Sequence, residues 1–80
     1  MKAYILIQTK FGASEEAIDD LRKSYGQLFI QGRSLYGWYD AMVEMEVSNI
    51  DELNEVTCKL KQDIPDVTYV GTAVERTGNH

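Results

Sequence analysis

The sequence predicts a single α+β domain with the element order strand, helix, strand, strand, helix, strand. Segments in which apolar and polar residues alternate indicate the strands, and apolar residues spaced three and four positions apart indicate the helices. Gly, Asn, Asp and Pro lie between these segments, where turns are expected. A chain of 80 residues has room for only one domain of this kind.

The N-terminal part of the chain predicts a strand followed by a helix. Residues 2–9 alternate in the manner of a strand that is covered on both faces. Gly12 then supplies conformational freedom for a turn, and Ser14 is a candidate helix cap. Apolar residues at helical spacing follow, so we expect a helix that ends near Gly26.

The middle of the chain predicts two consecutive strands. The first covers residues 27–36 and is interrupted by Gly32, which we interpret as a bulge. Residues 36–39 fit a two-residue hairpin with Gly37 at its first central position, as a type II′ turn requires. Residues 41–47 alternate most regularly and give the clearest strand in the chain.

The C-terminal part predicts a second helix and a last strand. Ser48 and Asn49 can both cap a helix, and acidic residues follow them as in a capping box. Pro65 ends this helix, and residues 67–76 alternate as a final strand. We therefore expect one domain over residues 1–77, with residues 78–80 as a frayed tail.

This order is that of the ferredoxin-like sandwich, in which both helices cover one face of a four-stranded antiparallel sheet. Right-handed crossovers place the first and third strands in the middle of the sheet. The other face would be a large exposed apolar patch if Tyr4, Leu6, Met42, Val70 and Val74 all point to that side. We therefore predict that it packs against a second copy of the chain, as a homodimer.

Composition excludes several classes of function. The net charge is -5, and no stripe of Lys and Arg is present, so direct nucleic-acid binding is not expected. No apolar run approaches the ~20 residues of a membrane span. The single Cys58 excludes an internal disulfide, which fits a reducing, cytoplasmic compartment, and we expect its side chain to be partly buried.

The residues do not assemble a catalytic set. The one histidine, His80, lies in the polar tail, and Glu44 and Glu46 are expected to form a solvated strand face rather than a pair of catalytic carboxylates. No glycine-rich phosphate loop follows the first strand. We therefore expect no enzyme activity, no metal and no cofactor.

The main candidate site is the aromatic corner formed by Gly37, Trp38, Tyr39 and Asp40. One interpretation is a hairpin whose rings cover the edge of the sheet. In the other, Gly37 lets backbone amides approach a ligand, Asp40 receives a cation such as an amino group, and Trp38 and Tyr39 form the walls.

Four stretches of the chain resemble a known family: "AYILIQTKFGASEEAIDDLRK", "LYGWYDAMVEMEV", "NIDELNEV" and "IPDVTYVGTAV". They are similar to the effector-binding domain of the Lrp/AsnC transcription regulators, the RAM domain. In that family a Gly-x-Tyr-Asp turn precedes the third strand, and residues 37–40 match this turn. An element of the type Ile-Pro-Asp/Gly-Val leads into the last strand, as residues 64–67 do here.

The resemblance implies a function and an assembly. Members of the family pair through their sheets into a dimeric α/β barrel and often form octamers or similar rings. They bind amino acids or related metabolites between dimers, and Gly37, Tyr39 and Asp40 match that loop, with Thr72 at a comparable position on the last strand. Because Met1 directly precedes the first strand, we expect a stand-alone form that acts with a full-length, helix-turn-helix regulator.

Three alternatives remain open. The chain can be a structural or adaptor oligomer without a ligand, with the aromatic corner as a contact between subunits. It can be a small dimeric α/β-barrel enzyme such as a cofactor-free monooxygenase, which would require a deep pocket within each subunit. It can also be an ACT-type domain, which shares the fold and would bind its ligand near Gly12.

Overall fold

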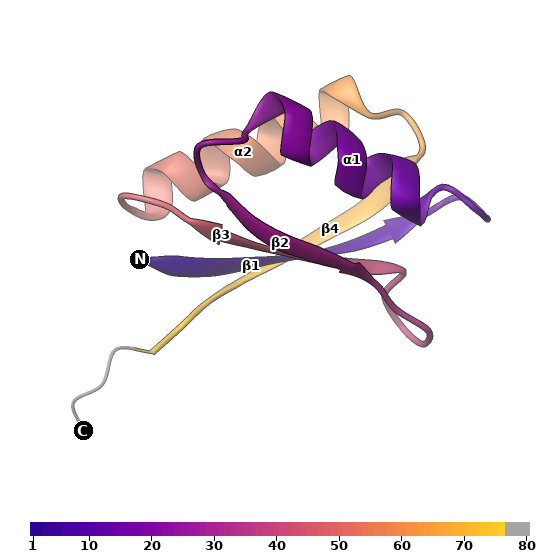
Figure 1. Ribbon diagram of the computed structural model, residues 1–80, viewed down its shortest axis with the longest axis horizontal. Coiled ribbons are helices and arrows are strands. Elements are labelled where there is room, and N and C mark those ends of the chain that lie inside the picture. Colours follow the sequence, from indigo (N-terminus) through magenta and orange to yellow (C-terminus); the bar gives the residue numbers. More distant parts are fainter. Residues whose placement is uncertain (77–80) are drawn as a thin grey trace.

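The computed structural model describes residues 1–76 and confirms the predicted ferredoxin-like βαββαβ fold (Figure 1). The expected frayed tail, residues 78–80, lies outside the described residues. The elements are β1 (Lys2–Thr9), α1 (Ser14–Ser24), β2 (Phe29–Ser34), β3 (Ala41–Glu46), α2 (Ile50–Asp63) and β4 (Val67–Val74).

The four strands form one antiparallel sheet in the order β2-β3-β1-β4. β1 and β3 therefore occupy the middle, as predicted. Both helices lie over the same face of the sheet, and the opposite face, here called the open face, has no helix over it (Figure 1). Ile5 of β1 lies opposite Val43 on one side and Thr72 on the other, which fixes the register of all three strands.

The core lies between the helices and the sheet. Alternate residues of β1 and β3 enter it from below, and one apolar stripe of each helix covers them from above. Each fully buried aliphatic side chain contributes about 1.5–3 kcal/mol to the free energy of unfolding. The largest of them are Ile5, Ile7, Leu21, Met45, Leu60, Val43 and Val47.

The predicted capping of α2 is confirmed. The side chain of Asn49 accepts a hydrogen bond of 2.9 Å from the backbone N–H of Glu52, and the Glu52 carboxylate accepts one of 2.7 Å from the N–H of Ser48. Two N–H groups at the start of the helix are thereby satisfied. At the other end Ile64 is extended before Pro65, and the helix stops.

The predicted cap of α1 is wrong. Ala13 is the N-cap residue, Ser14 is the first residue of the helix, and no side chain caps it. The Ser14 hydroxyl lies 3.0 Å from the hydroxyl of Ser34 instead. Ser14 thus links the start of α1 to the end of β2.

Gly32 is not the bulge that its position suggested. The irregularity in the pairing of β2 with β3 lies between Phe29 and Gln31. A Cβ atom at Gly32 would lie 2.6 Å from Cγ2 of Ile18, far inside van der Waals contact. Glycine is therefore needed at this position because α1 packs directly onto the backbone of β2.

A second irregularity changes which face of the sheet β4 residues occupy. The register between β1 and β4 shifts between Gln8 and Thr9, so the alternation of β4 is broken near its start. Val70 packs against the core, and Val74 lies opposite the core residue Ala3. Their predicted place on the open face is wrong. The β4 residues on that face are Tyr69, Gly71 and Ala73, opposite Gln8, Leu6 and Tyr4 of β1.

Candidate functional site

The loop between β2 and β3 is longer than predicted. The N–H of Leu35 donates a hydrogen bond of 2.8 Å to the carbonyl of Asp40, which encloses the four residues 36–39 instead of a two-residue turn. Gly37 has φ +128°, a conformation that L side chains rarely adopt, and apart from its two chain neighbours no residue has an atom within 4 Å of where its Cβ would be. The loop therefore needs glycine for its backbone conformation and not for space.

Asp40 fastens this loop to the end of β1. Its Oδ2 accepts a hydrogen bond of 2.8 Å from the N–H of Thr9. Its own N–H donates to the carbonyl of Ile7, also at 2.8 Å. The half-buried carboxylate thus has a structural role that the sequence did not predict, and it is held in a fixed position.

Tyr39 and Tyr69 form the aromatic part of the site. Their rings stack with centroids 6.3 Å apart and an interplanar angle of 29°. A Cβ at Gly71 would lie 3.6 Å from the Tyr39 hydroxyl oxygen and 3.5 Å from the Tyr69 ring. Both rings therefore lie beside Gly71 on the open face of the sheet, next to the loop.

The other predicted site residues are placed differently. Trp38 has 80% of its surface exposed, and its carbonyl accepts a hydrogen bond of 2.8 Å from Nε2 of Gln8. Thr72 lies opposite Ile5 on the helix-covered side of β4, away from Tyr39. One subunit therefore brings Gly37, Trp38, Tyr39 and Asp40 together in one loop but does not bring Thr72 to them.

Sequence reasoning missed three residues that hold or complete the loop: Gln8, Thr9 and Tyr69. A signal for two of them was present. The predicted antiparallel pairing of the first and third strands already places residues 8 and 9 beside the start of the third strand. Nothing in the alternation of β4 indicates Tyr69, because the bulge decides its face.

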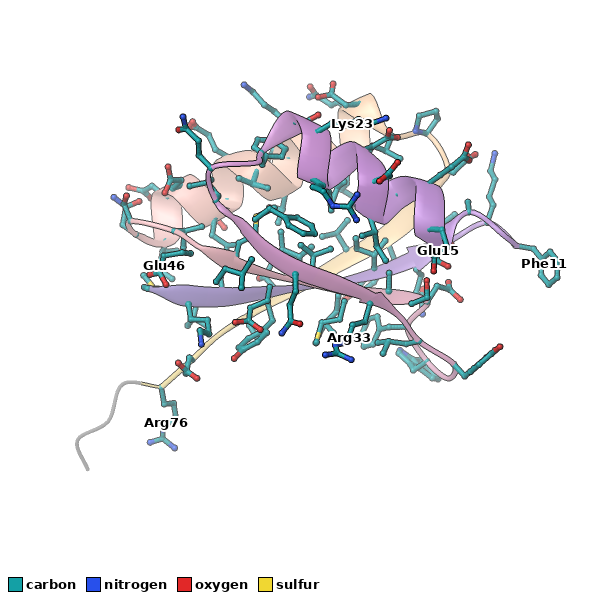
Figure 2. The ribbon with its side chains drawn as sticks, in the orientation of Figure 1. Phe11, Glu15, Lys23, Arg33, Glu46 and Arg76 are labelled. Atoms are coloured by element: carbon teal, nitrogen blue, oxygen red, sulfur yellow. The ribbon has the colours of Figure 1, made fainter. Side chains whose placement is uncertain are left out.

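Exposed aromatic side chains gather at this end of the molecule. Tyr36 at the hairpin and Phe11 at the turn after β1 are fully exposed. Figure 2 shows Phe11 pointing away from the body at the same end of the molecule as the β2–β3 loop of Figure 1. Tyr36, Phe11 and the exposed Trp38 are here called the exposed aromatic cluster, and exposed apolar surface of this kind is available for contact with another molecule.

At the opposite end of the open face, polar and charged side chains pair with one another. Glu44 was expected to be solvated, yet it has only 8% of its surface exposed. Its carboxylate accepts a hydrogen bond of 3.0 Å from Gln31 and lies 3.3 Å from the Lys2 ammonium. These partners, Gln31 first, lower the pKa of Glu44, whereas a general acid would need a raised one. Glu46 pairs with the N-terminal ammonium.

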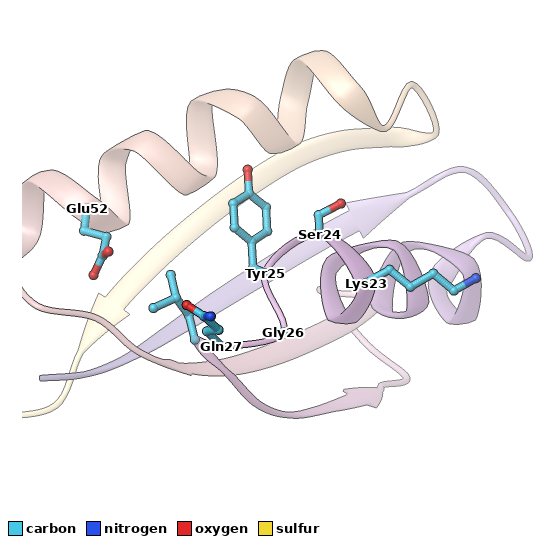
Figure 3. Close-up of a pocket in the computed structure, with 7 residues that line it drawn as sticks. Lys23, Ser24, Tyr25, Gly26, Gln27 and Glu52 are labelled. Carbon is cyan, nitrogen blue, oxygen red and sulfur yellow. The ribbon is translucent and has the colours of Figure 1, made fainter.

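The two depressions described on the surface lie elsewhere, between the helices. The larger has a volume of about 590 Å³ and is bordered by the end of α1, the α1–β2 turn and Glu52 (Figure 3). A smaller one of about 160 Å³ continues along α2. Neither includes a residue of the Gly37–Asp40 loop.

Three further observations concern the chemistry available to residues 1–76. Cys58 is exposed on α2, which corrects the expectation that it is partly buried. Within this described part, no group of three His, Cys, Asp or Glu side chains is placed to hold a metal ion. No helix among these residues is long and apolar enough to cross a membrane.

Comparisons with known proteins show the fold. The chain matches a hypothetical protein, PHS023, from Pyrococcus horikoshii with TM-score 0.79 and 22% identity, over 99% of this chain and 93% of that one. It matches TTHA0845 from Thermus thermophilus with TM-score 0.82 and 15% identity, over 99% and 96%. For PH0061 the TM-score is 0.75 and the identity 17%, over 100% of this chain and 54% of that one.

Sequence comparisons add nothing to this likeness. No family model matches the chain. No curated protein matches it by sequence. The three structural neighbours named above share 15–22% of their residues with this chain, and their likeness establishes its ferredoxin-like architecture alone.

Proposed function

We propose that this chain is a self-assembling regulatory module that binds an amino acid or a related small metabolite at the Gly37–Asp40 loop. The observation that carries the proposal is the anchoring of Asp40 by Thr9 in a loop whose sequence matches the Gly-x-Tyr-Asp turn of the Lrp/AsnC effector domains. A carboxylate fixed in this way is preorganised to receive a cationic group.

The chemistry of the loop suits a zwitterion. Because Thr9 uses Oδ2 of Asp40, Oδ1 is the oxygen that would receive the ligand ammonium. The flexible backbone geometry of Gly37 would let amide N–H groups approach the ligand carboxylate. The rings of Tyr39 and Trp38 would cover the apolar part. Thr72 faces the other side of the sheet, so it would join the site only from a neighbouring copy.

The open face would be covered by a second copy, which gives the dimeric α/β barrel. Tyr4, Leu6 and Met42 lie on this face, as predicted, and two of its charged side chains, Lys2 and Glu44, are paired with each other. Burial of such a paired group costs less than burial of a lone charge. The exposed aromatic cluster would then join dimers into an octamer or a similar ring.

The regulatory role would be indirect. The net charge of -5 opposes binding to DNA, so a full-length regulator with a helix-turn-helix would provide that contact. The match to PH0061, of which this chain covers only 54%, indicates that the same fold can be one part of a longer protein. The module would work in the cytoplasm, without a cofactor, as a sensor and not as an enzyme.

Calorimetry against the proteinogenic amino acids tests the sensing role. We expect a subset to bind with a Kd of roughly 1 mM or tighter, which is the range for ligands of about ten heavy atoms. Asp40→Asn should weaken binding about tenfold or more. The control Asp20→Asn removes the same charge from an exposed position on α1 and should leave binding unchanged. If no amino acid binds while the oligomer is intact, the sensing role is wrong.

Sedimentation velocity at micromolar concentration tests the assembly. The natural chain should sediment as a dimer or larger, and Leu6→Lys should dissociate it because the new charge would be buried in the interface. Ile50→Lys introduces the same charge on the helix layer, where Ile50 is 46% exposed, and should leave assembly unchanged. A natural chain that is folded and monomeric under these conditions would contradict the proposal.

The exposed aromatic cluster also favours a second function, that of an adaptor whose corner only joins subunits. Trp38 and Tyr36 are more exposed than a ligand wall needs to be. In that case Asp40→Ala would alter the size of the oligomer, and no amino acid would change it. The calorimetry above separates the two functions.

A further inference from the structure

A second candidate site lies on the helix layer, away from the loop and from the open face. The two depressions between α1 and α2 share three lining residues, Tyr25, Leu28 and Glu52. They therefore form one continuous feature, here called the interhelix groove. The larger depression, of about 590 Å³, falls in the size range of small-molecule sites, and the smaller one, of about 160 Å³, extends it along α2.

The floor of the groove is apolar. Tyr25 and Leu28 pack against the core from the turn after α1, and Val56 of α2 is only 2% exposed. In Figure 3 the ring of Tyr25 rises from this turn toward α2. Because these side chains already rest on the core, the floor has a fixed shape and can receive an apolar group without rearrangement.

Two carboxylates and two lysines border the groove. Glu52 and Glu55 lie on the α2 side, and Figure 3 shows the Glu52 side chain directed toward the turn. Lys23 borders the groove, but its side chain points away (Figure 3) and its ammonium lies 3.8 Å from the Asp19 carboxylate. Lys59 lines the smaller depression together with Glu55 and Val56, so one ammonium stands against the two carboxylates there.

One further effect favours a positive charge at the groove. The C-terminal end of α1 borders the groove at Ser24, and the helix dipole favours a positive charge there. The pKa of Tyr25 is raised by partial burial first, and then by the negative charges of Asp63 and Glu55. Asp63 and Glu55 therefore lie close enough for their negative charge to act on the Tyr25 hydroxyl.

We propose that the interhelix groove binds a small organic amine, with the ammonium near Glu52 and Glu55 and an apolar body over Tyr25, Leu28 and Val56. The stacking of a cation on the tyrosine face adds to the attraction of the carboxylates. This site does not depend on the proposed function, because it shares no residue with the Gly37–Asp40 loop and lies on the layer opposite the open face.

NMR titration of the ¹⁵N-labelled protein with phenethylamine tests the proposal. We expect saturable shifts of the amides of Gly26, Leu28, Glu52 and Val56, with a Kd of roughly 1–10 mM for a probe of about nine heavy atoms. Phenethyl alcohol has the same ring without the charge, and it should bind up to about fivefold more weakly, as expected when one partly exposed charge interaction is lost.

Variants locate the charge that recognises the amine. Glu55→Lys should weaken amine binding about tenfold, because it replaces an attractive charge by a repulsive one. Asp20→Lys changes the net charge equally on the exposed face of α1 and should leave binding unchanged. Glu52→Gln keeps a side chain able to close the helix cap and should weaken binding severalfold.

Four results would overturn the proposal. Equal binding of amine and alcohol would show an apolar crevice without charge recognition. Equal effects of Glu55→Lys and Asp20→Lys would show a nonspecific response to net charge. Shifts confined to residues 37–40 would place the amine at the loop. An absence of amide shifts at the groove up to about 10 mM phenethylamine, the weak end of the expected range of Kd, would exclude the site.

Discussion

Replacement of Asp40 separates the structural role of this residue from its proposed role in binding. Its Oδ2 accepts the Thr9 N–H at 2.8 Å, and a hydrogen bond to a charged acceptor is worth about 1.5–3 kcal/mol. Asp40→Ala removes the acceptor and should lower the free energy of unfolding by about 2 kcal/mol. Asp40→Asn keeps a neutral acceptor and should cost about 1 kcal/mol.

Thermal denaturation followed by circular dichroism measures both effects. In a domain of this size 1 kcal/mol corresponds to about 4–8 °C in Tm, so Tm should fall by roughly 8–16 °C for Asp40→Ala and by about half as much for Asp40→Asn. The exposed control Asp20→Ala should stay within about 0.5 kcal/mol of the natural chain. If Asp40→Ala melts together with that control, the bond to Thr9 does not hold the loop.

Three further variants test other parts of the structure. Gly32→Ala should destabilise the chain by about 1–3 kcal/mol because its Cβ would meet Ile18 at 2.6 Å. In urea denaturation the double variant Gly32→Ala/Ile18→Ala should lose less stability than the sum of the two single variants, whereas additive costs would refute the steric cause. Asn49→Ala should cost about 1 kcal/mol through loss of the α2 cap, and an unchanged urea midpoint would contradict it. The pKa of Glu44 lies below its ordinary value of 4.5 because of Gln31 and Lys2. The ionised carboxylate therefore stabilises the fold above pH 4.5, and this contribution is lost as the pH falls through the lowered pKa. The variant Glu44→Gln should lose less stability between neutral and acidic pH than the natural chain, and an identical loss would refute the assignment.

The parts of the fold that depend on local chemistry could be predicted from the sequence. The alternation of β1 and β3, the cap at Asn49 and the stop at Pro65 each report an interaction within a few residues. Such signals are strong because the responsible groups are neighbours in the chain. The order of the strands in the sheet then followed from the handedness of the crossovers.

The parts that failed depend on contacts between distant segments. Gly32 looks like a bulge in isolation, and only the closeness of Ile18 on α1 explains why it is glycine. Glu44 looks like a solvated carboxylate, and only the pairing of three strands places Lys2 and Gln31 beside it. In both cases the decisive neighbour is at least 13 positions away in the sequence.

The same limit explains why the candidate site was only half predicted. Its loop residues, from Gly37 to Asp40, are contiguous and could be named from a short motif. Its remaining aromatic side chain, Tyr69, depends on a one-residue irregularity in the pairing of β1 with β4 beside Gln8, which sends Tyr69 to the open face. There Tyr69 stacks on Tyr39 at 6.3 Å. An insertion or deletion at this irregularity would exchange the two faces of β4, so Tyr69 would leave the loop. The aromatic surface next to Asp40 therefore depends on the bulge as much as on the motif.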